Sequence, residues 1–312
     1  MANKKIKALL VGAIAIFLVM VAVYHLFPEA AFKVLIKAER AAGGLEPHRV
    51  QVGALRFEYL EGGQGESLVL LHGFGANKDH WTRIGRYLTP HFRVIAPDLT
   101  GFGESSPAPD GDYTIRAQAA RVDALVRTLG IPSFHLGGSS MGGQTAGVYA
   151  AVYPEKVKSL LLIAPGGIVS SEPSEMQRRL TAGEPNPLVA GDAAEFDRLM
   201  DFVFVTRPFI PAPIKGVLVQ EAIAHRPLNF EIFKQIRDSR NVAPLENLLR
   251  GETVPTLIIW GSQDRVLHVS GAAVLEAAMP NARVVVMKGV GHIPMIEKPK
   301  ETATRILAFL GR

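Results

Sequence analysis

The 312-residue sequence contains no cysteine, which excludes disulfide bonds and zinc sites built from thiolates. It also lacks a phosphate-binding loop, a dinucleotide fingerprint and a spaced set of metal ligands. Excess charge is confined to one end: the first 40 residues hold six Lys and Arg against two Asp and Glu, whereas the remaining residues hold 28 against 27. No concentrated basic face is therefore expected, and we predict no nucleic-acid partner.

A long apolar run lies near the N-terminus, where residues 8–27 contain no Asp, Glu, Lys or Arg. About twenty helical residues span roughly 30 Å, the thickness of a bilayer core. The run is longer than the apolar part of a cleavable signal peptide, and no small-x-small cleavage site follows Phe27. A retained anchor is therefore favoured over a cleaved signal. We predict that residues 1–28 form an N-terminal tail and transmembrane helix, with the bilayer as a partner.

Residues 29–48 are predicted to form a juxtamembrane helix and linker. Small and apolar residues recur there at helical spacing among Lys33, Lys37 and Arg40. Such a helix suits the headgroup level of a membrane, and a plain solvated spacer is the equally open alternative. A long apolar N-terminal helix also permits a homodimer, although no repeated small-xxx-small face is present.

Beyond residue 48, short apolar strands alternate with helical segments, for example a helix at 114–129, a strand at 157–163 and a closing helix at 302–310. This alternation predicts an α/β fold with a mostly parallel central sheet and helices on both faces. The pattern is interrupted between residues 167 and 250, where Pro and Gly separate short amphipathic pieces. We therefore predict a core of residues 49–166 and 251–312 and a helical cap of residues 167–250, which either gates the site or only packs on the core.

A G-x-S-x-G pentapeptide at residues 138–142 follows one apolar strand and opens into a helix-like run. At a sharp strand-to-helix turn, Gly138 and Gly142 leave room for the chain, and Ser140 is placed at the tip. A serine in this position is suited to attack a carbonyl group, with the positive end of the next helix behind it.

A serine nucleophile needs a base and an acid that orients the base. Asp264 and His292 each follow a predicted buried strand, and parallel strands place such residues at the same sheet edge. Alternatives remain open for each residue. Asp264 also suits a cap of the helix that starts near Val269, His292 also suits a structural role, and His268 is a rival base.

An oxyanion hole is the fourth expected part of the site. In a serine hydrolase built on this turn, one donor is the backbone N–H that follows the nucleophile, here that of Met141. The second donor is expected from the loop after the strand at residues 67–71, and we assign it to the backbone N–H of Phe74. The side chain of Phe74 suits either an acyl pocket or plain packing.

The order Ser140, Asp264, His292 is typical of the α/β-hydrolase fold. Residues 72–81, 140–151 and 258–264 closely resemble the membrane-anchored monoacylglycerol lipase and phospholipase A branch of the α/β hydrolases. The loop at residues 98–105 resembles one found across the superfamily, including C–C bond hydrolases. Haloalkane dehalogenases carry an aspartate in place of Ser140, which argues against dehalogenation.

The resemblance implies a membrane-anchored enzyme that releases fatty acids from glycerolipids through an acyl-enzyme, without metal or organic cofactor. A small-ester carboxylesterase or a C–C bond hydrolase is the alternative within enzymes, and a non-catalytic membrane-tethered binding protein is the alternative outside them. The expected location is a membrane with a single N-terminal pass. In a bacterium, this is the cytoplasmic membrane with the catalytic domain facing the periplasm.

Overall fold

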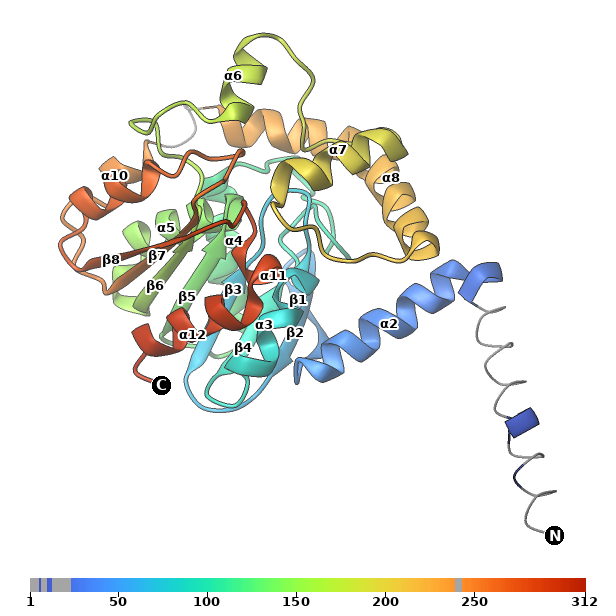
Figure 1. The fold of residues 1–312 in the computed structure, drawn as a ribbon. Helices are drawn as coiled ribbons and strands as arrows, with labels where there is room; N and C mark the ends of the chain where they lie inside the picture. Colours follow the sequence, from blue (N-terminus) through green and yellow to red (C-terminus); the bar gives the residue numbers. More distant parts are fainter. Residues whose placement is uncertain (1–5, 7–9, 13–23, 239–242) are drawn as a thin grey trace.

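In the computed structural model, which describes residues 6, 10–12, 24–238 and 243–312, eight strands form one sheet (Figure 1). Their spatial order is β1-β2-β4-β3-β5-β6-β7-β8. The strands are β1 (Glu46–Val52), β2 (Leu55–Gly62), β3 (Ser67–Leu71), β4 (Arg93–Pro97), β5 (Phe134–Ser139), β6 (Val157–Ile163), β7 (Thr256–Gly261) and β8 (Ala282–Met287).

The pairing separates an antiparallel end from a parallel body. The β1–β2 and β2–β4 pairs are antiparallel, and all pairs from β4 to β8 are parallel. The carboxyl ends of β3, β5, β6, β7 and β8 therefore lie along the same edge, which in such sheets carries the functional loops. The predicted fold class is confirmed.

Helices cover both faces of the sheet, because the parallel strands are apolar on both sides. Val69 and Leu71 of β3 belong to one core cluster, whereas Leu68 and Leu70 belong to a second cluster. The first cluster includes residues of α4 (Ile115–Thr128), α5 (Met141–Val152), α9 (Leu245–Leu248) and α10 (Gly271–Ala278), and the second includes residues of α3 (Thr82–Leu88), α11 (Pro294–Glu297) and α12 (Pro299–Phe309). Two 3-10 turns, η1 (Lys78–Trp81) and η2 (Pro154–Lys156), complete this part.

Between β6 and β7 the chain forms α6 (Glu175–Thr181), α7 (Ala193–Val203), α8 (Ala212–Arg237) and α9. Figure 1 shows α6, α7 and α8 along the upper edge of the sheet. Residues 214–224, one of the short amphipathic pieces between 167 and 250, form the first half of α8, which continues through Pro227 to Arg237. The far half of α8 is held by Gln235, which bonds the backbone of Tyr113 and Gly111, and by the fully buried Ile232.

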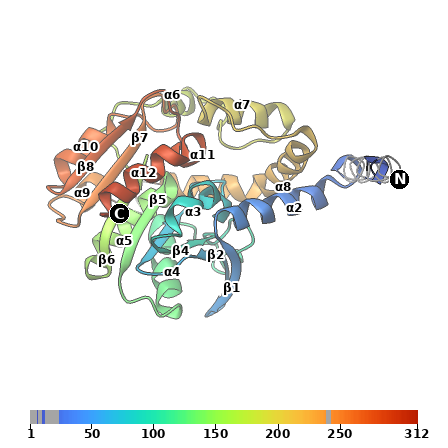
Figure 2. The ribbon, with the colours of Figure 1, turned by 60° about the horizontal axis from the view of Figure 1, so that its bottom comes forward.

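The helix predicted after residue 28 is α2 (Pro28–Ala42), which contacts both α3 and α8 (Figure 2). Its second half is tied to the core by two hydrogen bonds of 2.7 Å from Arg40 to the carboxylate of Asp79. Glu39 also accepts a 3.0 Å bond from Arg83. This half of α2 is therefore attached to the core by ion pairs, while none of its residues is buried. Strand β1 begins at Glu46, inside the stretch predicted as linker.

Most of the predicted membrane crossing, residues 8–27, lies outside the described residues. Within the described residues, no helix is both long enough and apolar enough to cross a bilayer.

Candidate active site

The turn at residues 138–142 places Ser140 between the end of β5 and the start of α5. Ser140 has φ 55° and ψ −116°, a region that residues other than glycine rarely adopt. A Cβ at Gly138 would lie 2.2 Å from the carbonyl oxygen of Gly142, and a Cβ at Gly142 would lie 2.3 Å from that of Leu71. Both distances are too short for any side chain, so the turn requires both glycines.

Backbone hydrogen bonds hold this strained turn against β6. The N–H of Ser140 donates to the carbonyl oxygen of Ile163 at 2.9 Å, and the N–H of Gly166 donates to the carbonyl oxygen of Ser140 at 3.0 Å. Ser140 directly precedes α5, whose unpaired N–H groups make its first turn electropositive. The side chain of Ser140 therefore stands where a developing negative charge is stabilised.

The loop after β3 runs beside Ser140. A Cβ at Gly73 would lie 3.2 Å from Cβ of Ser140 and 3.9 Å from its Oγ. Phe74 is the next residue, and its ring packs against Phe102 and against Phe233 of α8, with centroids 6.0 and 5.3 Å apart. The backbone of this loop is thus close to the turn that carries Met141, which is the arrangement that the predicted oxyanion donors require.

Asp264 and His292 are joined by a hydrogen bond of 2.7 Å between Oδ2 of Asp264 and Nδ1 of His292. The exposed fractions of the two side chains are 0% and 6%, so water competes little for this bond. The other carboxylate oxygen, Oδ1, accepts bonds from the N–H groups of Val266 and Leu267 at 2.8 and 3.0 Å. Asp264 therefore also stabilises its own turn, but it does not cap α10, which begins at Gly271.

His268, the rival base, has a different partner. Its Nδ1 bonds to Oγ of Ser270 at 2.9 Å, and within the described residues no bond joins it to Asp264. His135, which the sequence places inside a strand, lies in β5 and bonds through Nδ1 to Oγ of Ser159 at 2.8 Å. Neither histidine shares the buried carboxylate that His292 contacts.

The position of His292 is fixed by the end of α7. The backbone N–H of His292 donates to the carbonyl oxygen of Val203 at 2.8 Å. The carboxylate of Glu297 accepts the N–H groups of Gly291, Val205 and Thr206 at 3.1, 3.2 and 3.1 Å. A Cβ at Gly291 would lie 2.6 Å from the carbonyl oxygen of Val203, so the two segments are in direct contact. Nothing in the sequence pattern indicated this role of Glu297.

A buried ion pair lies under the loop that carries Phe74. Nζ of Lys78 contacts carboxylate oxygens of Asp98 and Glu104, each at 2.6 Å, and the exposed fractions of the Lys78 and Asp98 side chains are 2% and 0%. Burial opposes the charge on Lys78, but the two carboxylates outweigh it and raise the pKa of Lys78 above its usual value. The sequence showed only that residues 98–105 form a superfamily loop, and no spacing connected that loop to Lys78.

Two further histidines near the site are neutral. Burial lowers the pKa of His72 to about 4 and that of His80 to about 3, and the neighbouring His292 contributes to the shift of His80. Nε2 of His72 accepts the N–H of Leu99 at 2.9 Å. Nδ1 of His80 is buried without a hydrogen-bond partner among the described residues. Neither ring adds positive charge beside His292 at neutral pH.

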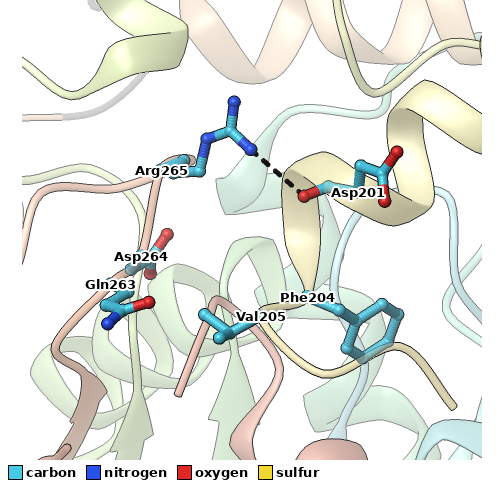
Figure 3. Close-up of a pocket in the computed structure, with 6 residues that line it drawn as sticks. All are labelled: Asp201, Phe204, Val205, Gln263, Asp264 and Arg265. Atoms are coloured by element: carbon cyan, nitrogen blue, oxygen red, sulfur yellow. Dashed lines mark hydrogen bonds between the residues drawn. The ribbon is translucent and has the colours of Figure 1, made fainter. Parts of the chain in front are cut away.

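A cavity of about 520 Å³ opens beside Asp264 and is lined by Asp201, Phe204, Val205, Gln263, Asp264 and Arg265 (Figure 3). Arg265 links this cavity to α6 and α7, because it donates to the carbonyl oxygen of Asp201 in α7 at 3.2 Å and to Glu175 of α6 at 2.6 Å. Ser140 and His292 do not line this cavity. It therefore adjoins the candidate acid and not the candidate nucleophile.

The five predicted site residues thus lie at the carboxyl edge of the sheet, in the loops that follow β3, β7 and β8 and in the turn from β5 into α5. Asp264 and His292 are hydrogen-bonded, and no hydrogen bond joins His292 to Ser140 in the described part of the chain. In the same part, no group of three or more His, Asp or Glu side chains is placed to hold a metal ion.

A strained serine turn in front of a helix, with an Asp–His pair at the same sheet edge, is typical of serine hydrolases of the α/β-hydrolase fold. The chain belongs to the α/β-hydrolase fold family, whose model matches residues 66–200 and 207–299.

The similar proteins agree with this class. The chain is 37% identical to "Lipase 1" of Psychrobacter immobilis over 279 residues, which cover 88% of this chain and 87% of the lipase. It is 32% identical to human "Monoacylglycerol lipase ABHD6", with coverages of 96% and 92%. The crystal structure of a "membrane phospholipase A, a novel bacterial virulence factor" superposes with a TM-score of 0.89 at 42% identity, covering 98% of each chain. The resemblance to the lipase and phospholipase branch is confirmed.

Proposed function

We propose that the protein hydrolyses acyl esters of membrane lipids, with Ser140 as nucleophile, His292 as base and Asp264 as the acid that orients it. The observation that carries the assignment is the buried 2.7 Å bond from His292 to Asp264 at the edge that carries the strained Ser140 turn. Nδ1 of His292 is occupied by Asp264, so Nε2 is the ring nitrogen left to take the proton of Ser140.

In the proposed reaction, Oγ of Ser140 attacks the ester carbonyl while His292 removes its proton. The N–H groups of Met141 and Phe74 stabilise the tetrahedral oxyanion, and the positive end of α5 adds to this effect. His292 then protonates the leaving alcohol, and an acyl-enzyme remains on Ser140. Water, activated by the same imidazole, releases the fatty acid.

Lipid esters are the proposed substrates because the similar proteins are lipases, a monoacylglycerol lipase and a membrane phospholipase A. The uncharged residues 8–27 support a membrane anchor that brings the enzyme to such substrates. We further propose that residues 167–250 form a cap over the edge that carries Ser140, since their helices α6, α7 and α8 lie along that edge (Figure 1).

The test compares Ser140→Ala with Ser139→Ala in the full-length protein. Loss of a triad nucleophile lowers kcat by about a millionfold, so Ser140→Ala is expected to lose both activity and labelling by a fluorophosphonate. Ser139 is a buried serine of the adjacent strand, and Ser139→Ala is expected to keep both within about tenfold. A Ser140→Ala variant that retains a tenth of the activity contradicts the assignment.

Substrate class is tested with monoacylglycerols and lysophospholipids of increasing chain length, beside short nitrophenyl esters and a C–C bond hydrolase substrate. Preference for the long acyl chains is expected. A preference for the short esters or for C–C cleavage would replace the lipid assignment while leaving the three catalytic roles in place. Absence of turnover and of labelling would favour a non-catalytic binding protein.

A further inference from the structure

The connection between α7 and α8, residues 204–211, exposes apolar side chains to solvent. Phe209 is 88% exposed and Val205 is 44% exposed. The loop begins at the buried Phe204 and ends at Pro211, which precedes the first turn of α8. An aromatic ring that stays exposed at the tip of a loop lacks roughly 2 kcal/mol of the free energy that burial supplies. The residues around the loop therefore indicate which partner buries the Phe209 ring.

The loop leads into α8, and α8 packs against the helix that follows the predicted membrane crossing. Helix α8 contacts α2, and Figure 2 shows the two helices side by side. Burial raises the pKa of Glu221 in α8, and the carboxylates of Asp79, Glu104 and, least of the three, Glu29 in the first turn of α2 add to this shift. Leu26 and Phe27, just before α2, are more than half exposed. Exposed apolar side chains therefore occur both in the 204–211 loop and at residues 26 and 27, where the apolar run 8–27 ends.

The cations near the loop are already paired, which determines how the loop can bind. Arg207 bonds to the carboxylate of Asp201 and, at 2.8 Å, to the carbonyl oxygen of Asp197. Nζ of Lys215 contacts the Asp197 carboxylate at 2.7 Å. These charges are neutralised by α7, so the loop offers apolar contact and little attraction for anionic groups.

The start of the same loop is attached to the catalytic histidine. Glu297 holds the N–H groups of Val205 and Thr206 together with that of Gly291, and the N–H of His292 bonds to Val203. Val205 also lines the cavity beside Asp264 (Figure 3). A surface that the loop binds is therefore close to His292, because only a few residues separate the tip of the loop from the segment that is hydrogen-bonded to this histidine.

We propose that residues 205–210 insert into the headgroup region of the bilayer that holds the N-terminal segment, with Phe209 as the main inserted side chain. The inference rests on the membrane anchoring proposed above. Aromatic side chains favour this region of a membrane, and amphipathic elements reach about 5–10 Å into it. The bilayer is the occupant that the structure favours, because the loop leads into α8, and α8 contacts the helix that continues from the predicted crossing. The contact gives the anchored domain a second membrane attachment next to His292.

The first test uses fluorescence of the full-length chain in phosphatidylcholine vesicles that contain brominated acyl chains. The natural Trp81 and Trp260 are 0% and 1% exposed, so they provide a nearly constant background. Phe209→Trp is compared with Val152→Trp, which is 52% exposed at the last residue of α5, away from the loop. Both are made in a Ser140→Ala background so that the probe lipid is not consumed. The added emission at position 209 is expected to fall at least about twofold in brominated vesicles, and that at 152 to stay unchanged.

Equal quenching at both positions, or none at position 209, overturns the proposal. Emission at 209 that changes with protein concentration and not with bromination indicates a second copy as the occupant, which also overturns it. Quenching does not depend on hydrolysis. Quenching at position 209, combined with a chain that keeps Ser140 but does not hydrolyse lipid esters, therefore refutes the proposed function and leaves the loop contact standing.

The second test measures the ratio of two activities, on a long-chain ester in vesicles and on a dissolved short-chain ester. Phe209→Asp is expected to lower this ratio about tenfold, because a carboxylate at the tip opposes insertion. Replacing part of the phosphatidylcholine by anionic phosphatidylglycerol is expected to change the ratio by a similar factor in the wild type and in Phe209→Asp, since Arg207 and Lys215 next to the loop are paired with carboxylates of α7. An unaltered ratio in Phe209→Asp, or an effect of anionic lipid that is lost in Phe209→Asp, contradicts apolar insertion.

Discussion

Helices α5 and α8 both border the candidate site, but they are packed very differently. Ten of the twelve residues of α5 are buried, whereas three of the twenty-six residues of α8 are buried. Helix α5 lies within the first core cluster, next to the turn that carries Ser140. Helices α6 and α7, like α8, contribute few residues to a core, and α6 contributes none.

The difference separates two requirements of an enzyme that acts on a large substrate. The groups that perform chemistry must hold their positions within fractions of an ångström, and dense packing below the sheet edge provides that. Helices that cover an entrance must be able to move, and a small buried area keeps the free energy of local opening low. We make four predictions that test this contrast between the rigid core and the weakly packed helices α6, α7 and α8, which we call the cover.

The largest effect is expected from Asp264→Asn, which changes the core and leaves the cover intact. The amide supports the wrong tautomer of His292, and kcat on a dissolved ester is expected to fall about ten-thousandfold, as for loss of the acid in other triads. The control is Asp201→Asn on α7, which alters an exposed carboxylate of the same cavity and should cost less than about threefold. Comparable losses in both variants would break the contrast.

The second prediction concerns stability. Lys78→Met leaves the buried carboxylate of Asp98 without its cation, which is expected to lower the free energy of unfolding by about 3–5 kcal/mol. In the matched cover variant Lys215→Met, the lost pair with Asp197 has side chains that are 36% and 40% exposed, and the expected loss is below about 1 kcal/mol. Urea unfolding followed by circular dichroism measures both variants. Equal losses would mean that the cover is as tightly packed as the core.

The third prediction is a dependence of stability on pH. The pKa of His80 is about 3 in the folded chain, below its value of about 6.5 in an unfolded chain. Between these values the unfolded state binds more protons, so stability is full above pH 6.5 and is lost as the pH falls toward 3. His80→Met removes the titrating group, and the buried Nδ1 of His80 has no hydrogen-bond partner to lose in the described part of the chain. The unfolding free energy of His80→Met minus that of the wild type should be more positive at pH 5 than at pH 8, by roughly 1–2 kcal/mol. A pH dependence as steep as that of the wild type would contradict the assignment.

The smallest effect is expected at the contact between core and cover. Glu297→Ala frees the N–H groups of Gly291, Val205 and Thr206 and should lower kcat about tenfold, with little change in KM, because the imidazole of His292 is less well placed. Glu297→Gln retains one acceptor and should recover part of the loss. Glu301→Ala, which removes an exposed carboxylate of α12, serves as the control. A change confined to KM, or a loss of folding without a change in kcat, would refute a positioning role.

The core was largely predictable from the sequence because its signals are local. Apolar runs of strand length and the Gly-Ser-Gly turn depend on neighbouring residues, and the helix at 114–129 and the strand at 157–163 match α4 and β6 closely. The loops that carry Ser140, Asp264 and His292 were predicted to lie at the same edge of the sheet only because each one follows a predicted strand. The predicted roles of these residues remain to be tested.

The cover was predicted less well because its structure depends on distant contacts. Judged from neighbouring residues alone, Pro227 predicts that a helix ends, because proline lacks the N–H group for one backbone hydrogen bond. Helix α8 nevertheless continues, because Ile232 is buried and Gln235 bonds to residues more than a hundred positions earlier. The contacts of Glu297 with Val205 and of Lys78 with Asp98 likewise join remote segments, and no sequence spacing identifies them.

The bond between the N–H of His292 and the carbonyl oxygen of Val203 limits how this enzyme can be recombined with its relatives. A chimera that imports a foreign cover up to residue 202 but retains 203–206 keeps the backbone acceptor and the Glu297 partners intact. One whose junction falls inside 203–206 exchanges the support of the His292 imidazole along with the helices α6 and α7. Substrate range and turnover are therefore expected to be separable in the first design and to change together in the second.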